Sequence, residues 1–441
     1  MQIIVLIPCL ICAFALFRYS VPHVFLRYFL PFFVLFPSYY YWKISALPPI
    51  TVGQSALLPI GAAIVLTLMR RWRFTTSDIW IGLFLLSTCV TEYKAERTTA
   101  AIFNLYYGVC EGLIPYMIGK VLIEQSGIRA ATARRIVTLM TICGIISLYE
   151  YRMSINPFTL VWGRFFQNES FAWKTQLRWG FGRVSGPYGQ SELAGMVILF
   201  GIMLAVWVSY AKPWPEKFPW FPNHPLNVKT IIFILLAIFL FTTQARGPWL
   251  GCLFALPIAF IGKSKHIWRN CVLFFGITLP ILGFTYVQVK QHLVNADPSS
   301  AEAQTAQYRA LLFDNYKPTA IAGGPFGWGQ AFRRVPGQES IDNEYLFIWL
   351  TQGWVGLASM CLLGVEALIR LFAAAAVTKD RMDRFFAFSL FGTYAGLLLT
   401  VGTVFLGNQP YELFFLIAGW SQVLNRVQPE QPKLEFHNVM A

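Results

Sequence analysis

The chain contains little charge: Asp, Glu, Lys and Arg together make up 13% of its 441 residues. An ordinary soluble domain is about 25% charged, so this composition does not supply a normal water-facing surface. The sequence also contains no HExxH, P-loop, GxSxG or dinucleotide-binding motif, which excludes the enzyme classes that those motifs define. Its five histidines are scattered: His23, His224, His266, His292 and His437. We therefore expect neither a metal site nor a cofactor.

The cysteines offer no alternative chemistry. Most of the eight fall inside apolar stretches, where a thiol is usually a packing group. Cys9 and Cys12 have the CxxC spacing, but they lie in the middle of an apolar stretch with no partner motif, so we expect packing rather than a redox or zinc site. No basic stretch precedes this first apolar segment, and we expect it to remain as a helix rather than to be cleaved as a signal peptide.

Hydrophobic residues, in contrast, make up 56% of the chain and are grouped in blocks. Many blocks approach the roughly 20 residues that a helix needs to cross about 30 Å of hydrocarbon. Fifteen Trp, nineteen Tyr and thirty-nine Phe, many at the ends of these blocks, are typical of aromatic belts at membrane interfaces. The sequence therefore predicts an all-α, polytopic integral membrane protein with twelve or thirteen transmembrane helices. The thirteen candidate spans are residues 3–17, 24–40, 49–69, 79–91, 100–121, 136–151, 192–210, 230–244, 248–261, 271–287, 345–369, 385–406 and 412–424.

The basic residues set the orientation of these spans. Short basic connections belong in the cytoplasm, and we place five there: residues 70–73, 120–135, 212–229, 263–269 and 370–384. Two sizeable segments then lie on the outer side. We divide the chain into N-terminal transmembrane helices (1–150), an outer basic loop (151–187), a second transmembrane region (188–424) that includes a large outer loop (288–342), and a cytoplasmic tail (425–441).

Both outer loops are expected to bear short helices. In the second loop, Ser299 and Glu302 have the spacing of a capping box, and a helix is predicted over residues 303–313. The same loop then runs into GGPFGWG (323–329), a turn-rich stretch that does not continue as a long helix.

Two arginines lie next to apolar spans, where charge is costly and demands a reason. Arg246 lies in TTQARGP (242–248), between two short apolar blocks, and Arg183 lies in GRVSGPYGQSELA (182–194), just before a span. A guanidinium binds phosphate through paired donors, and a helix beginning near Ser191 adds partial positive charge beside Arg183. The alternatives are that Arg246 only extends to the lipid headgroups and that Arg183 lies in an ordinary loop with Ser191 as the helix cap.

A third polar cluster, Asp342-Asn343-Glu344, marks the junction of the large outer loop and the next span. Asp342 or Glu344 can remove a proton from a sugar hydroxyl if burial makes the carboxylate more basic. The alternative is structural, with Asp342 or Asn343 capping the helix and Glu344 favouring its positive end.

These stretches, in this order, resemble the O-antigen ligase family, which includes lipopolysaccharide O-antigen ligases, O-antigen polymerases and exopolysaccharide polymerases. The resemblance covers roughly residues 177–364. It rests on Arg183 and its glycine-rich turn, on Ala245-Arg246-Gly247, on Arg309 with the Gly-x-Gly at 327–329, and on Asp342-Asn343 followed by GWVG (353–356). The family has Ser where this chain has Ala245 and His where it has Asp342, and the second difference puts the family's proposed proton-handling role in doubt here.

The resemblance implies a metal-independent glycosyltransferase, a polysaccharide polymerase or O-antigen ligase, on the outer face of a bacterial cytoplasmic membrane. The donor is expected to be a glycan on undecaprenyl diphosphate, and the acceptor another glycan or a lipid. Membrane lipids and polysaccharide-assembly proteins are further expected partners, and nucleic acid is not. Arg183 and Arg246 are expected to stabilise the leaving diphosphate, and Asp342 to act as the base. Arg309, Glu344, Asn343 and Arg178 are expected to bind substrate, with Glu344 as a second candidate base.

Two other functions fit the same residues. A secondary transporter of an anionic solute uses arginines as ligands near the midplane of the membrane, although the sequence shows no inverted repeat. A non-catalytic partner of a polysaccharide synthesis complex is the other alternative.

Overall fold

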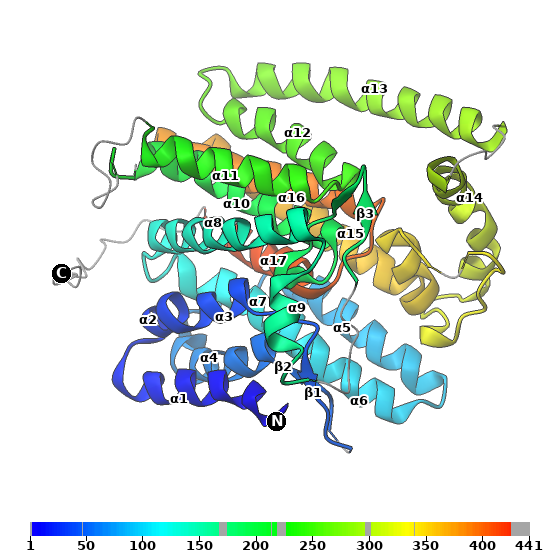
Figure 1. Cartoon of the computed structure of the whole chain (residues 1–441). Coiled ribbons are helices and arrows are strands. Elements are labelled where there is room, and N and C mark those ends of the chain that lie inside the picture. The colour runs from blue at the N-terminus through cyan, green and yellow to red at the C-terminus, as the bar shows by residue number, and fades with distance from the viewer. Residues whose placement is uncertain are drawn as a thin grey trace.

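The computed structural model describes residues 2–45, 47–166, 174–212, 214–217, 226–295, 301–338 and 340–424. Within these ranges the chain is almost entirely helical, and its only strands form two short antiparallel hairpins (Figure 1). The predicted all-α class is therefore confirmed. The tail at 425–441 and the capping residue Ser299 lie outside the described residues.

The first part of the chain forms helices that are divided by prolines and by π-helical turns. In order, they are η1 (Gln2–Leu6), α1 (Ile7–Arg18), α2 (Val21–Val24), η2 (Phe25–Phe29), α3 (Leu30–Leu35), α4 (Val52–Leu68), η3 (Met69–Arg71), α5 (Thr76–Lys94), α6 (Thr98–Tyr107), η4 (Gly108–Leu113), α7 (Ile114–Met117), η5 (Ile118–Ile123), α8 (Arg129–Met153) and α9 (Pro157–Trp162). Strands β1 (Tyr41–Trp42) and β2 (Ile50–Thr51) pair just before α4.

The second part begins with the hairpin of β3 (Leu177–Arg178) and β4 (Phe181–Gly182). It continues through η6 (Gly186–Tyr188), α10 (Ser191–Ala211), α11 (Val228–Thr242), α12 (Arg246–Ile261), α13 (Ile267–Asn295), α14 (Ala301–Ala322), η7 (Gly329–Ala331), α15 (Glu344–Val377), α16 (Arg381–Val401) and α17 (Asn408–Ser421). The helix predicted at 303–313 is thus longer than expected, because α14 continues through Pro318 to Ala322.

Each predicted span falls on a helix or on a continuous run of helices. Six helices are long and apolar enough to cross a membrane: Val52–Arg71, Arg129–Met153, Ser191–Ala211, Ile267–Gln288, Glu344–Val377 and Arg381–Val401. Shorter apolar helices occupy Gln2–Arg18, Val21–Leu35, Val228–Thr242 and Arg246–Ile261. Four predicted spans run past their helices: α3 ends at Leu35 and α16 at Val401, five residues early, and α11 ends at Thr242 and α17 at Ser421, two and three residues early. A polytopic helical membrane protein is confirmed, and the number of crossings stays a prediction.

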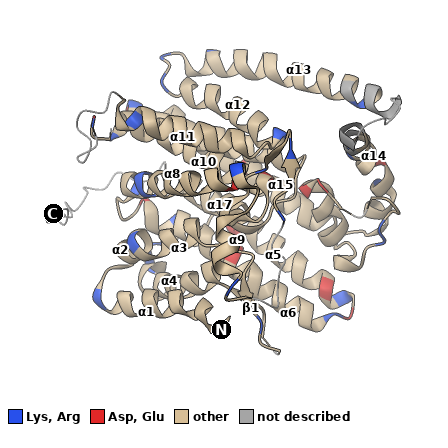
Figure 2. Ribbon diagram, in the orientation of Figure 1, with Lys and Arg blue, Asp and Glu red and all other residues tan. Residues whose placement is uncertain are grey.

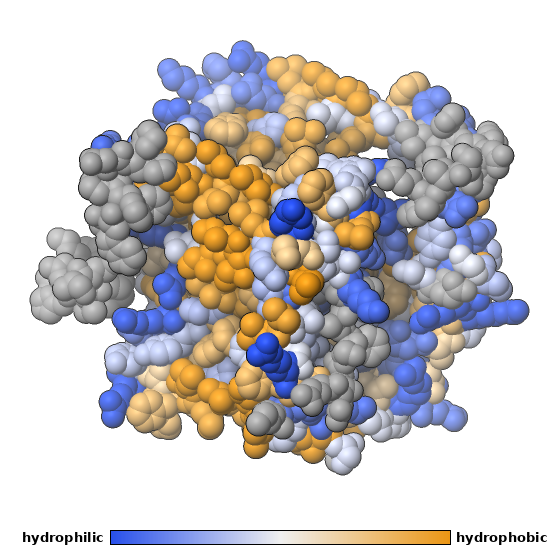
Figure 3. Space-filling model, viewed as in Figure 1, coloured by the Kyte–Doolittle hydropathy of each residue, from blue (hydrophilic) through white to orange (hydrophobic). Residues whose placement is uncertain are grey.

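Helix α10 lies at the centre of the second part, and nearly all its side chains are buried. It contacts α8, α11, α12, α16 and α17. Charged residues gather mainly at helix ends and in loops (Figure 2), whereas apolar side chains form broad outward surfaces over α11 and α13 (Figure 3). This distribution places the polar chemistry at the ends of the helices.

Close packing fixes the beginning of α12 against α16. A Cβ atom added at Gly251 would lie 2.5 Å from the Thr400 hydroxyl and 2.8 Å from the Gly396 carbonyl oxygen. At Gly247, it would lie 2.8 Å from the Thr403 hydroxyl. Only glycine allows this approach, so the first turn of α12 has a defined position beside the end of α16.

Helix α13, in contrast, separates from the bundle along its length. Its first half packs against neighbouring helices, with Phe274 5.3 Å from Phe254 and Trp268 4.8 Å from Phe372 between ring centroids. Further along, Ile277, Ile281, Phe284 and Tyr286 are each more than half exposed. The far end is joined to α14 by an ion pair of 2.8 Å between Lys290 and Asp314, which raises the pKa of the Lys290 ammonium. The outer half of α13 thus offers an apolar surface that the rest of the described chain leaves uncovered.

Candidate active site

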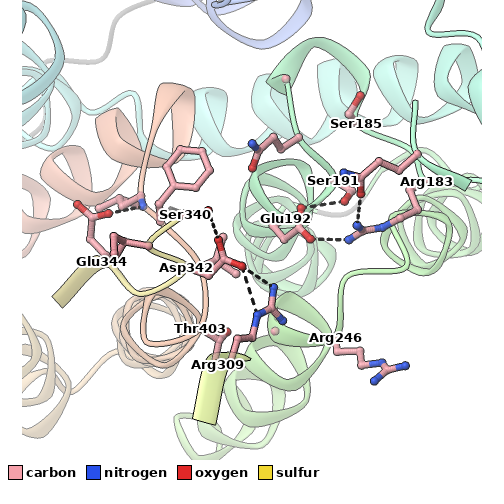
Figure 4. A pocket seen from close by; sticks show the side chains of 18 of the residues that line it. Arg183, Ser185, Ser191, Glu192, Arg246, Arg309, Ser340, Asp342, Glu344 and Thr403 are labelled. Atoms are coloured by element: carbon pink, nitrogen blue, oxygen red, sulfur yellow. Dashed lines mark hydrogen bonds and ion pairs between the residues drawn. The ribbon is translucent and has the colours of Figure 1, made fainter. Parts of the chain in front are cut away.

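One cavity of about 950 Å³ lies where the two predicted outer segments meet. The β3–β4 hairpin, α14, the connection after α16 and the N-termini of α10, α12 and α15 form its walls (Figure 4). Basic residues predominate over acidic ones in the lining, which includes Lys174, Arg178, Arg183, Arg246, Arg309 and Arg334 against Glu192, Asp342 and Glu344. The three helix N-termini add partial positive charge. The cavity is therefore suited to an anionic group.

Arg183 is buried in the wall and is held by two acceptors. Its Nη1 donates to Gln176 Oε1 at 2.6 Å, and its Nη2 pairs with Glu192 Oε1 at 2.5 Å. Glu192 is the second residue of α10, and its other oxygen accepts a hydrogen bond of 2.9 Å from the Ser191 hydroxyl. The N-cap of α10 is Gln190, so the alternative with Ser191 as the cap is wrong. The sequence did not single out Glu192. The one local indication of its role is its position in the first turn of a helix.

The turn that carries Arg183 is organised by Glu150 near the end of α8. This carboxylate is fully buried, and it accepts hydrogen bonds from the backbone amides of Ser185 at 3.1 Å and Gly186 at 2.9 Å. The hydroxyls of Ser185 and Thr175 also donate to it, at 2.9 and 3.0 Å. Four donors fix the glycine-rich turn, in which Gly186 has a φ of +54°. Glu150 was also missed, because its partners lie 25 to 36 residues further along the chain.

Arg246 is the first residue of α12 and is exposed to the cavity. Its side chain points away from the pair of Arg183 and Glu192 (Figure 4). A turn precedes it, with Gln244 at a φ of +50°. Arg178 supports this turn, since its Nη1 donates to the Gln244 carbonyl oxygen at 2.6 Å. Arg178 therefore lines the cavity and also links the hairpin to the junction of α11 and α12.

Asp342 and Arg309 meet across the opposite wall. Arg309 Nη2 and Nε lie 3.1 and 3.4 Å from Asp342 Oδ2, and the Ser340 hydroxyl donates to Oδ1 at 2.9 Å. Both charged side chains are partly exposed. Asp342 does not cap α15, so its carboxylate faces the cavity rather than the helix.

Asn343 caps α15 instead. Its Oδ1 accepts from the Leu346 amide at 3.0 Å, and its Nδ2 donates to the Gly402 carbonyl oxygen at 2.7 Å. Glu344 is buried at the edge of the cavity and accepts from the Leu406 amide at 2.7 Å. It is directed away from Asp342 (Figure 4). The structure thus unites Arg183, Arg246, Arg309, Arg178, Asp342 and Glu344 in one lining, whereas Asn343 is not part of it.

The glycine-rich turn after α14 is inserted into a break in α15. Gly353 has non-helical angles, φ +68° and ψ −167°, inside that helix. The amides of Trp354 and Val355 donate to the Gly324 and Pro325 carbonyl oxygens at 3.3 and 3.1 Å, and a Cβ at Gly353 would lie 2.4 Å from Pro325. The break in α15 therefore positions the segment that ends α14, the helix of Arg309.

Residues 231–361 match the family model for O-antigen ligase. This part of the chain is thus similar to the O-antigen ligase family. No curated protein matches the chain. The family match supports, in general terms, a role in joining polysaccharides.

The O-antigen ligase region includes Arg246, Arg309, Asp342 and the break at Gly353. Arg183 and its turn precede the matched residues, but they line the same cavity. In this O-antigen ligase-like protein, residues outside the matched region therefore form one wall of the cavity.

Several lining residues of the O-antigen ligase-like protein had no sequence signal. They are Lys174, Gln176, Trp179, Phe332, Arg334, Phe347, Thr403 and Phe405. Across the described part of the chain, no three His, Cys, Asp or Glu side chains are grouped as metal ligands. All eight cysteines, including Cys9 and Cys12, are free thiols.

Proposed function

We propose that this protein transfers a glycan from undecaprenyl diphosphate to a hydroxyl of a second glycan or of a lipid, at the outer face of a bacterial cytoplasmic membrane. The observation that carries the proposal is the shared cavity of Arg183, Arg246, Arg309 and Asp342 within an O-antigen ligase-like chain. Segments predicted to lie outside the membrane meet at this cavity, which supports the outward orientation.

The arginines suit the departing diphosphate. The acceptor oxygen attacks the anomeric carbon, the bond from that carbon to the diphosphate oxygen breaks, and the electron pair leaves with the diphosphate. Guanidinium groups that are already in position stabilise this growing charge without reorganisation. Neither α10 nor α12 has a side-chain cap, so their first amides are further donors. We therefore propose a metal-independent transfer by single displacement, with inversion at the anomeric carbon.

Asp342 suits the role of base. Its Oδ2 is paired with Arg309 and its Oδ1 with Ser340. A diphosphate that draws the Arg309 guanidinium toward itself frees Oδ2, which then accepts the proton of the attacking hydroxyl. Glu344 is less suited, because its carboxylate binds the Leu406 amide.

The polyprenyl chain of the donor requires an apolar path to the cavity. The outer half of α13 is uncovered and is joined to α14, the helix that carries Arg309. Arg246 begins α12, the helix that packs against the first half of α13. We propose that the lipid tail lies along this surface while the diphosphate enters between Arg246 and Arg309.

The test compares Arg183→Ala and Arg246→Ala with Arg333→Ala, all in a strain lacking the native gene. Arg333 is exposed beside the lining residue Arg334 but does not line the cavity, so it matches the loss of charge without the site. We expect the first two variants to insert normally and to lose surface glycan, and Arg333→Ala to retain it. Normal amounts of surface glycan in both cavity variants would refute the proposed enzymatic function.

Purified protein in lipid vesicles distinguishes the other candidates. Glycan transfer from a polyprenyl diphosphate donor to a lipid-linked acceptor supports the proposal. Uptake of an anionic solute without transfer indicates the transporter. Neither activity, together with loss of glycan in cells lacking the gene, indicates a non-catalytic partner.

A further inference from the structure

The tip of the β3–β4 hairpin carries an unusual backbone. The two turn residues, Trp179 and Gly180, have φ values of +55° and +80°, as a two-residue hairpin turn of this kind requires. Asn, Asp or Gly ordinarily fills the first position, and a bulky side chain there is strained. A strained backbone conformation beside a cavity invites a functional explanation.

Aromatic contacts fix the hairpin from two sides. The Phe181 ring stacks on Tyr151 of α8 at 4.8 Å and 8°. On the other side, the Trp179 ring lies 6.4 Å from Trp249 of α12, which stacks on Phe241 at 5.4 Å and 6°. The Trp249 indole nitrogen donates to the Leu240 carbonyl oxygen at 2.8 Å, which fixes the orientation of that ring. Trp179 therefore occupies a defined place, although the residue is 55% exposed.

Trp179 lines the cavity among polar neighbours. Lys174, Gln176 and Arg178, from the same segment, line the same wall. A sugar ring presents C–H groups on its faces and hydroxyls around its edge, so an aromatic ring beside hydrogen-bonding groups matches both of its surfaces. A lipid chain forms no hydrogen bonds with these polar groups. A tryptophan that only anchors the protein at the membrane interface would not have to line a cavity.

We infer that Trp179 and its polar neighbours form a glycan subsite at the rim of the cavity, where the indole stacks on a pyranose ring that is not itself the reacting unit. This inference rests on the proposed function, and it assigns to the hairpin the task of holding the sugar chain beside Arg183. The subsite binds sugar by its ring face, so it also retains a glycan that carries no diphosphate.

The test measures binding without requiring transfer. The probe is a set of short oligosaccharides released by mild acid from the surface polysaccharide of the source cell, titrated calorimetrically into protein in lipid nanodiscs. Trp179→Leu keeps an apolar side chain but removes the flat ring, and Trp179→Phe keeps a flat ring. Both substitutions leave a side chain at the same positive φ. Trp268→Leu, an exposed tryptophan that does not line the cavity, is the control.

We expect Trp179→Leu to weaken binding about tenfold, Trp179→Phe to remain within about threefold of the wild type, and Trp268→Leu to leave binding unchanged. In transfer assays Trp179→Leu should raise KM with little change in kcat. Binding by Trp179→Leu equal to that of the wild type overturns the subsite. Equal loss in Trp179→Leu and Trp179→Phe also overturns it, because it indicates a structural role.

Saturation-transfer NMR on the wild type keeps the test decisive if Trp179→Leu does not fold. Contacts concentrated at the C–H protons of a sugar ring support stacking, and their absence contradicts it. Failure of the proposed function can be distinguished from failure of the subsite. If the wild-type protein shows no transfer activity, oligosaccharide binding by the wild type and the variants can still be compared.

Discussion

The guanidinium of Arg309 on α14 lies 3.1 Å from the carboxylate of Asp342 at the start of α15. This pair joins the helix of the predicted outer loop to the beginning of a candidate membrane-spanning helix. Within this ion pair each group neutralises the other. Substrate therefore has to exchange this contact for its own contacts before either group acts on it.

Replacing Asp342 by Asn should lower the rate of transfer by about 100-fold or more, as loss of a general base does. The fold should be unaffected, because Asn343 and not Asp342 caps α15. The measurement is the initial rate in nanodiscs, with donor binding as the control. Asp342→His should retain part of the activity, because the resembling family carries histidine there. Full activity of the Asp342→Asn variant would show that Asp342 is not the base and only pairs with Arg309.

Replacing Glu192 by Gln removes the charge that neutralises the buried Arg183. The protein should lose about 1–3 kcal/mol of stability, because Gln still accepts a hydrogen bond but leaves the buried Arg183 guanidinium without its counter-charge. Arg183 should also be less well oriented, so transfer should fall about tenfold, the effect of about 1.4 kcal/mol on the barrier. Thermal unfolding and initial rates check both effects. Glu216→Gln, an exposed glutamate in the connection before α11, should change neither.

Replacing Gly353 by Ala should disturb the junction between α15 and the turn at 323–329. The added Cβ would lie 2.4 Å from Pro325, and the φ of +68° disfavours any side chain. We expect lower thermal stability and a larger loss of activity. Gly276→Ala in α13 is the matched control, because its Cβ meets nothing within 4 Å. That variant should be neutral or stabilising by up to about 1 kcal/mol; if both variants behave alike, the junction has no special role.

Replacing Glu150 by Ala should release the turn at 182–189, since four donors lose their common acceptor. A buried donor without a partner costs about 1–3 kcal/mol, so several such donors should prevent stable folding of the turn. Proteolysis within the turn and thermal unfolding are the measurements. Unchanged protection in this variant would show that the turn is held by other contacts.

The helices could be predicted from the sequence because crossing a membrane demands long apolar runs, and such runs are local. The ends of α3 and α16 were misplaced because apolar residues continue beyond the last helical turn. Arg183 and Arg246 were recognised because each stands beside glycine at the edge of an apolar block. Glu150 and Glu192 were missed because the role of each carboxylate depends on the groups that it contacts, and these groups come close to it only in the folded chain. Trp179 gave no signal, since an interfacial tryptophan looks the same in sequence.

The uncovered outer half of α13 has a consequence for every assay described above. Because this apolar surface belongs to a candidate membrane span, the thickness and packing of the surrounding bilayer should bear directly on α13, and through Lys290 and Asp314 on the helix of Arg309. Replacing lipid by a short-chain detergent should change the environment of that helix without any change in the sequence. The membrane is in this sense a structural component of the proposed active site, and activity should depend on lipid chain length.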